Sequence, residues 1–110
     1  MSRRPVGGTG SLRGPPDLRV FNHDCMRREV TVELARGREV IAVERTSLAR
    51  GSNQCWRNLL DDAGDYRVVV SLRYGPSETA EWTVERPRRA GIDVVLRSGD
   101  VHVHPGGRRF

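Results

Sequence analysis

The sequence predicts an all-β domain, an antiparallel sandwich of seven or eight short strands. Apolar and polar residues alternate in a series of short segments, which is typical of strands with one buried face. Turns rich in glycine and proline separate these segments, and no segment carries the long apolar stripe of a helix. At 110 residues the chain is the size of one domain with one core. One apolar face per strand predicts that sheet packs on sheet.

The domain is expected to span residues 17–105. Residues 1–16 are rich in glycine and proline, with Val6 and Leu12 as their larger aliphatic residues, so they bury too little surface to offset chain entropy and are expected to form a flexible tail. Residues 106–110 are expected to form a short basic tail. The predicted strands are, in order, Leu18–Phe21, Glu29–Leu34, Glu39–Arg45, Asn53–Arg57, Tyr66–Arg73, Thr79–Glu85, Ile92–Arg97 and Val101–His104.

The fifth predicted strand shows the alternation most clearly. Its inward face would hold Tyr66, Val68, Val70 and Leu72. Trp82 has the same inward register on the sixth strand and is expected in the core. Trp56 is expected to cap the core, and the alternative is an exposed contact patch.

Turn residues lie between the predicted strands at the places where hairpins need them. The three clearest turns are Arg36-Gly37, Tyr74-Gly75-Pro76-Ser77 and Ser98-Gly99-Asp100. They favour antiparallel neighbours over crossover helices.

The formal net charge of +5 lies in the tails. Five tail arginines account for the whole excess, so residues 17–105 hold equal numbers of arginines and acids. A polyanion-binding function, nucleic acid included, would use the tail arginines and a basic loop, which are Arg3, Arg4, Arg13, Arg86, Arg88, Arg89, Arg108 and Arg109. Aromatic residues are not interleaved with them as stacking platforms. The alternative is a solvated surface of balanced charge.

Two cysteines, Cys25 and Cys55, are candidates for one disulfide. A bridge would close a loop of about 30 residues, worth about 3 kcal/mol in the chain-entropy model. The alternative is a pair of small buried thiols in a reducing compartment.

A metal site is the second candidate centre. His102 and His104 alternate with valines, so on a strand both imidazoles point to one side. His23 and Cys25 are also two residues apart and would complete the site if they lay nearby. The alternative is a set of exposed polar residues on an edge strand, since no C-x-x-C or H-E-x-x-H motif is present.

Catalytic motifs are missing from the sequence. It has no G-x-S-x-G elbow, no glycine-rich phosphate loop after a strand, and no carboxylate pair in an evident pKa-raising pocket. We therefore expect neither an enzyme nor a cofactor. No apolar run approaches the roughly 20 residues that cross a bilayer, and no apolar signal segment follows Met1. The chain is thus either an intracellular protein or a processed or engineered form of an exported one.

Short strands at close spacing with turn signals predict a sandwich or a barrel, and one local motif favours the sandwich. Asp62-Ala63-Gly64-Asp65-Tyr66 resembles the D-x-G-x-Y sequence that precedes strand F in immunoglobulin-like domains. The resemblance implies that Tyr66 forms a tyrosine corner, with its hydroxyl bonded back to nearby backbone, and that Asp62 and Gly64 belong to the same structure. Val68 stands where a true immunoglobulin domain has the inter-sheet cysteine, so the antibody-type disulfide is absent.

A wider resemblance covers roughly Asp17 to Val103. This segment is similar to small immunoglobulin-like modules of archaeal and bacterial cell-surface proteins and lipoproteins. The resemblance implies an immunoglobulin-like antiparallel sandwich, an extracellular or cell-surface location, and a role in adhesion or assembly rather than catalysis.

The expected function is a non-enzymatic interaction or assembly module of a surface or virion structure. It would bind a protein partner or another copy of itself through edge strands, which present unpaired backbone groups. The candidate edges are Glu39–Arg45 and Val101–His104. Polyanion binding by the arginine tails and a metal-dependent module are the two alternatives.

Overall fold

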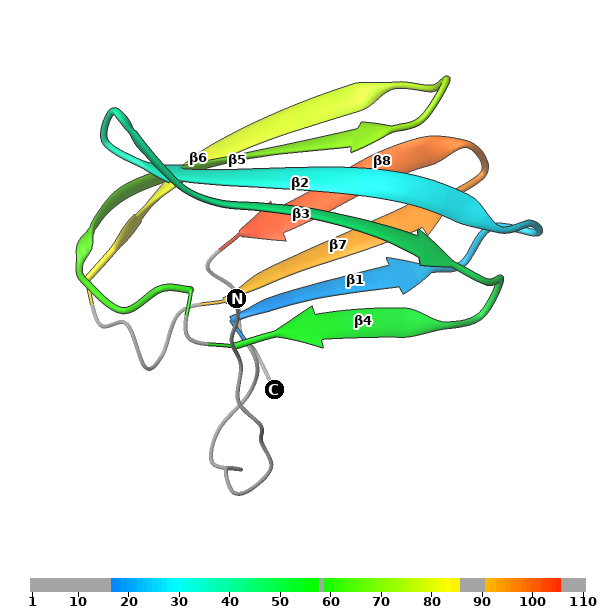
Figure 1. The fold of residues 1–110 in the computed structure, drawn as a ribbon, viewed down its shortest axis with the longest axis horizontal. Coiled ribbons are helices and arrows are strands. Elements are labelled where there is room, and N and C mark those ends of the chain that lie inside the picture. The colour runs from blue at the N-terminus through cyan, green and yellow to red at the C-terminus, as the bar shows by residue number, and fades with distance from the viewer. Residues whose placement is uncertain (1–16, 58, 86–90, 106–110) are drawn as a thin grey trace.

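The computed structural model describes residues 17–57, 59–85 and 91–105. This part of the chain forms two packed four-stranded sheets (Figure 1). The strands are β1 (Leu18–Asn22), β2 (Arg28–Arg36), β3 (Glu39–Leu48), β4 (Asn53–Trp56), β5 (Gly64–Leu72), β6 (Ser77–Val84), β7 (Ile92–Arg97) and β8 (Asp100–Pro105). All eight predicted strands are present, and the predicted β-sandwich is confirmed. The described part of the chain holds no helix long and apolar enough to cross a membrane.

The two sheets have the strand orders β4-β1-β7-β8 and β3-β2-β5-β6. Every neighbouring pair is antiparallel except β1 and β7, which run in parallel. In antibody constant domains the first two strands share a sheet, whereas here β1 and β2 lie in different sheets. The architecture is therefore that of an immunoglobulin-like sandwich, but the strand order is a different one.

The core lies between the sheets and follows the alternation in the sequence. Each strand of the two central pairs buries every second side chain, as β5 does with Tyr66, Val68, Val70 and Leu72. Trp56 and Trp82 pack against this core but are only partly buried, so the prediction that Trp82 is a core residue holds only in part. The rings of Trp82 and Tyr66 lie 5.6 Å apart across the β5–β6 pair.

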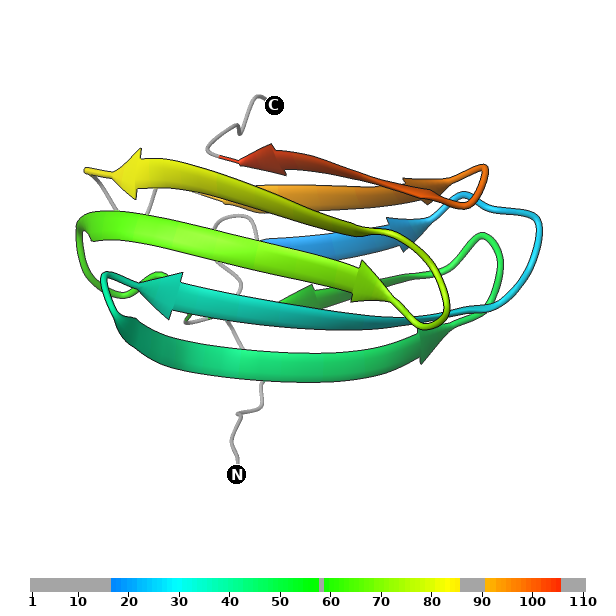
Figure 2. The same cartoon turned by 90° about the horizontal axis from the view of Figure 1, so that it is seen from above.

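The direction of the strands determines at which end of the sandwich each connection lies. Odd-numbered strands run toward one end and even-numbered strands run back, as Figure 2 shows from above. One end therefore holds the connections at residues 23–27, 49–52, 73–76 and 98–99, which we call the loop end. The opposite end, which we call the terminus end, holds the β2–β3 turn at 37–38, the starts of β1, β5 and β7, and the ends of β4, β6 and β8.

Six strands are longer than the sequence predicts, and three of them show why. β3 continues past Arg45 to Leu48, because its last residues pair with the first residues of β2. β5 begins at Gly64 and β6 begins at Ser77, because the two strands pair with each other along their whole length. Backbone pairing thus extends strands through polar residues that carry no apolar signal.

Candidate functional site

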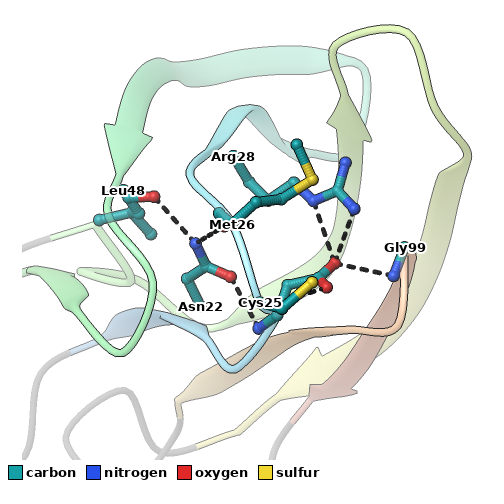
Figure 3. Close-up of polar contacts among 7 residues, drawn as sticks. Asn22, Cys25, Met26, Arg28, Leu48 and Gly99 are labelled. Carbon is teal, nitrogen blue, oxygen red and sulfur yellow. Dashed lines mark hydrogen bonds and ion pairs between the residues drawn. The ribbon is translucent and has the colours of Figure 1, made fainter.

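The side chain of Asn22 joins three parts of the loop end. Asn22 occupies an inward register position at the end of β1 and is 0 % exposed. Its amide nitrogen donates to the carbonyls of Met26 (2.9 Å) and Leu48 (2.8 Å), and its amide oxygen accepts from the backbone amide of Asp24 (2.9 Å) (Figure 3). Its own carbonyl accepts a hydrogen bond from Gly51 (2.8 Å). The β1–β2 loop is thereby attached to the β3–β4 turn.

The carboxylate of Asp24 extends the network to a third loop. Asp24 is 8 % exposed. One oxygen accepts from the amide of Cys25 (2.8 Å), and the other accepts from the amide of Gly99 (2.8 Å) and pairs with the guanidinium of Arg28 (2.9 Å). The hydrogen bond from the Cys25 amide, then that from Gly99, lowers the pKa of Asp24, with a smaller contribution from Arg28, and these outweigh the opposing effect of burial.

The fourth loop joins through the start of β2. The backbone amide of Arg73 donates to the carbonyl of Glu29 (3.0 Å), and their side chains form an ion pair at 2.9 Å. A further backbone bond, from His23 to Leu96 (2.8 Å), attaches the β1–β2 loop to β7. Three loops of this end are therefore connected through the buried Asn22 and Asp24, and the fourth is fastened to β2 by the exposed pair of Arg73 and Glu29.

On this fixed base the loop end presents two large apolar side chains. Met26 is 51 % exposed and Tyr74 is 91 % exposed. Tyr74 has a φ of 60°, a left-handed conformation that is unfavourable for a bulky residue. The guanidinium of Arg73 lies 4.8 Å from the centre of the Tyr74 ring and donates to its hydroxyl (2.9 Å). An exposed turn of the loop end thus holds an aromatic residue in an unfavourable backbone conformation.

Exposed arginines lie at the same end of the sandwich. Arg27, Arg50 and Arg97 lie at the loop end, and within the described residues none of them forms an ion pair with a carboxylate. Arg27 donates instead to the hydroxyl of Ser47 (3.2 Å). A rigid surface of arginine, tyrosine and methionine is suited to noncovalent recognition, because these residue types are enriched in protein interfaces.

The candidate metal ligands do not come together. His102 and His104 point outward from β8, whereas His23 lies beyond the end of β1, with β7 between the two strands. Two inter-strand spacings separate them by about 10 Å, and Cys25 lies in the β1–β2 loop. Within the described residues no group of three metal-ligating side chains is present. The predicted four-residue metal site is therefore wrong.

The predicted disulfide is also wrong. Cys25 and Cys55 are both free and exposed. β4 runs back along β1, so Cys55 lies opposite Arg19 on the outer face of its sheet, while Cys25 lies in the loop beyond the far end of β1. The antiparallel pairing thus moves the two thiols apart along the strand direction.

The tyrosine corner has the geometry that its motif predicts. The Tyr66 hydroxyl donates to the carbonyl of Asp62 at 2.7 Å. Gly64 has a φ of 151°, and a β-carbon there would lie 3.1 Å from Cδ of Arg36. The Arg36 guanidinium in turn pairs with the Asp62 carboxylate (2.7 Å). This cluster stabilises the terminus end.

The two predicted edge strands do lie at sheet edges, β3 in one sheet and β8 in the other. β3 exposes Val40 (50 %) and Val43 (57 %) on its outer side. It also carries a bulge opposite Leu34, and its Glu44 pairs with Val32 and so points toward the inner side of the sheet. Bulges and inward charges protect an edge from pairing with another strand.

The arginines proposed for polyanion binding, in contrast, all lie outside the described residues. Arg3, Arg4, Arg13, Arg86, Arg88, Arg89, Arg108 and Arg109 belong to residues 1–16, 86–90 and 106–110. That function stays a prediction from the sequence.

Sequence reasoning missed the Asn22 and Asp24 network. A signal was available, because Leu18, Val20 and Asn22 share one register and a polar residue at the third inward position needs a partner. The partners themselves are backbone groups of other loops, which no side-chain pattern reveals.

Comparison with known proteins places this fold in a family. A family model described as halobacterial Ig-like domain matches residues 26–109. No curated protein matches the chain. Among solved structures, the chain is similar to 5-hydroxyisourate hydrolase from Klebsiella pneumoniae, with 16 % identity, a TM-score of 0.51, and coverage of 84 % of this chain and 100 % of that one. At this identity the likeness shows the fold alone. The matched model covers most of the sandwich, and the chain therefore belongs to the halobacterial Ig-like domain family.

Proposed function

We propose that this domain is a non-enzymatic interaction module that binds a protein partner through its loop end. One observation carries the proposal: a buried network fixes three of the four loops of an end that exposes Tyr74 and Met26, and a backbone bond with an exposed ion pair fastens the fourth to β2. Loops that are ordered before binding lose less conformational entropy when a partner arrives. A surface prepared in this way favours specific recognition.

Chain direction supports the same end. The chain enters the sandwich at Leu18 and leaves it at Pro105, both at the terminus end. The loop end thus lies at the far side of the domain from the points where β1 begins and β8 ends (Figure 1). Immunoglobulin variable domains also bind through loops clustered at one end of the sandwich.

The edge of β3, predicted from the sequence as a docking site, has weaker support. Its bulge and the inward Glu44 oppose the addition of another strand. Val40 and Val43 nevertheless form an exposed apolar pair there, which provides a matched control for the test.

The proposal is tested by affinity capture from an extract of the cells that express the protein. Three baits are compared: the wild-type chain, the double variant Met26→Ser/Tyr74→Ser, and the double variant Val40→Ser/Val43→Ser. We expect a protein that the wild type and the β3 variant retain and that the loop-end variant retains about tenfold less. The captured protein is then purified, and its Kd for each bait is measured by calorimetry.

Thermal melts of the three baits show whether each variant is folded. If the β3 variant alone failed to retain the captured protein, the docking site would be the edge of β3. Equal retention by all three baits, or the absence of any protein that binds after purification, would overturn the proposal.

A further inference from the structure

We infer that the partner of the loop end is an acidic polypeptide segment, recognised through its carboxylates by arginines of at least three loops. The inference rests on the proposed function and adds the chemistry of the partner. It follows from which arginines of the loop end are already neutralised and which are not.

Two arginines at this end have their charge balanced inside the domain. Arg28 pairs with the buried Asp24 at 2.9 Å, and Arg73 pairs with Glu29 at 2.9 Å. The ion pair and a hydrogen bond from Arg73 to the Tyr74 hydroxyl raise the pKa of Arg73 further above its ordinary value. These two guanidinium groups hold the loops in place.

Three other arginines are available to a ligand. Arg27 comes from the β1–β2 loop, Arg50 from the β3–β4 turn and Arg97 from the end of β7, and all three are exposed. Within the described residues none has a carboxylate partner. Arg97 stands opposite Asp100 in the β7–β8 hairpin without forming an ion pair. The loop end therefore carries a local excess of positive charge, although residues 17–105 are neutral as a whole.

The arrangement favours an acidic protein over a nucleic acid. Nucleic-acid surfaces need cations along the path of the phosphate backbone and aromatic rings on which bases stack. Here the arginines are spread around the end of the sandwich, and Glu29 and Asp100 stand among them. The two aromatic rings of these loops are already engaged, because Tyr74 has a guanidinium against it and His23 lies 5.9 Å from the ring of Phe21. Mixed charges around Met26 and Tyr74 suit a peptide that carries carboxylates together with an apolar side chain.

The test uses the full-length 15N-labelled chain and defined probes. The first probe is a peptide of about twenty residues, glutamate with a leucine at every fifth position, and its control has glutamine in place of glutamate. The second probe is a thymidine oligonucleotide of about the same length. Amide chemical shifts locate each binding site, and titration gives each Kd.

We expect the glutamate peptide to shift amides of residues 23–27, 49–52, 73–76 and 98–99, and the glutamine peptide to bind at least about tenfold more weakly. Raising the salt concentration should strongly weaken the binding of the glutamate peptide, because salt screens exposed charges. Arg27→Gln/Arg50→Gln/Arg97→Gln should reduce its affinity about tenfold or more. A matched variant, Arg38→Gln/Arg45→Gln/Arg67→Gln, removes the same charge from exposed arginines elsewhere and should change the Kd less than about twofold.

Three outcomes would overturn the inference. The first is a glutamine peptide that binds as tightly as the glutamate peptide. The second is an oligonucleotide that binds the loop end more tightly than the glutamate peptide does. The third is an equal loss of glutamate-peptide affinity in the two triple arginine variants. Glutamate-peptide shifts confined to residues outside the loop end would overturn it as well. If the captured partner binds the loop end without dependence on salt or on these arginines, the acidic chemistry is wrong but the proposed function stands.

Discussion

The two ends of this sandwich are stabilised in different ways. At the loop end a buried amide and a buried carboxylate connect three of the four loops to one another through their backbones. At the terminus end, Tyr66 bonds to Asp62 within one connection, while the Asp17 carboxylate bonds to the amides of Leu59 and Leu60, and Arg36 pairs with Asp62 across the chain. The loop end is therefore held by buried polar side chains, while the terminus end is held largely by partly exposed ones.

The two ends also differ in the direction in which folding shifts the pKa of a carboxylate. Backbone hydrogen bonds lower the pKa of Asp24 at the loop end. At the terminus end, burial and the nearby charges of Asp17 and Asp62 raise the pKa of Asp61. Asp24 is a hydrogen-bond acceptor, whereas Asp61 lies near two other carboxylates. Ionisation of Asp24 thus stabilises the fold at neutral pH, and ionisation of Asp61 opposes folding.

The largest expected effect comes from removing the amide that unites the loops. Asn22→Ala leaves the carbonyls of Met26 and Leu48 without their side-chain donor and the Asp24 amide without its acceptor. We expect a loss of about 3 kcal/mol in the free energy of unfolding, because unpaired buried polar groups are costly. Urea denaturation measures it, with the exposed Asn53→Ala as the control. A loss below about 0.5 kcal/mol would show that the three connected loops do not depend on Asn22.

At the terminus end, removing the Tyr66 hydroxyl should lower the free energy of unfolding by a smaller amount. Tyr66→Phe keeps the ring in the core and removes one hydrogen bond, from the hydroxyl to the Asp62 carbonyl. We expect a loss of about 1 kcal/mol, since only one bond is lost. Hydrogen exchange should show faster exchange in residues 59–65 and unchanged exchange at the loop end. Changes spread over both ends would contradict the independence of the two regions.

Tyr74 allows a test of whether the loop end sacrifices stability for binding. Tyr74→Gly removes a left-handed strain of about 1 kcal/mol. The same substitution removes an exposed contact with Arg73 and raises the conformational entropy of the unfolded chain. The net gain in the free energy of unfolding should therefore be smaller than the strain that is removed. We expect a thermal midpoint that is unchanged or slightly raised, together with weaker partner binding. A clear fall in the midpoint would assign Tyr74 a structural role instead.

The smallest effect is the opposite response of the two ends to acid. The pKa of Asp24 is lowered on folding, so its contribution is present above the unfolded value near 3.8 and is lost as pH falls through the folded one. The pKa of Asp61 is raised, so its ionisation opposes folding at neutral pH, and this penalty disappears as pH falls through the raised value.

Asp61→Asn should therefore raise stability at pH 7 by less than about 0.5 kcal/mol and have less effect near pH 3. Asp24→Asn should lower stability at pH 7 and have less effect in acid. Thermal melts across this pH range check both signs. Parallel pH curves for the two variants would contradict the contrast between the ends.

The strands were predictable because alternation is a local property of the chain. All eight strands appear within a few residues of their predicted bounds, and the D-x-G-x-Y motif predicts the hydrogen bond that Tyr66 makes. The pairing of Cys25 with Cys55 and the grouping of His23 with His102 and His104 failed. Both depend on which strands are neighbours, and the alternation is equally compatible with many strand orders.

By itself the sequence determined the class of fold, the number of strands, the turns and one structural motif, because each depends on residues close together in the chain. Only the tertiary structure decided the parallel pairing of β1 with β7, and with it the positions of the thiols and imidazoles. It also decided that Asn22 and Asp24 meet Leu48 and Gly99. The partners in those bonds are backbone groups, which every residue carries, so only the path of the folded chain selects them.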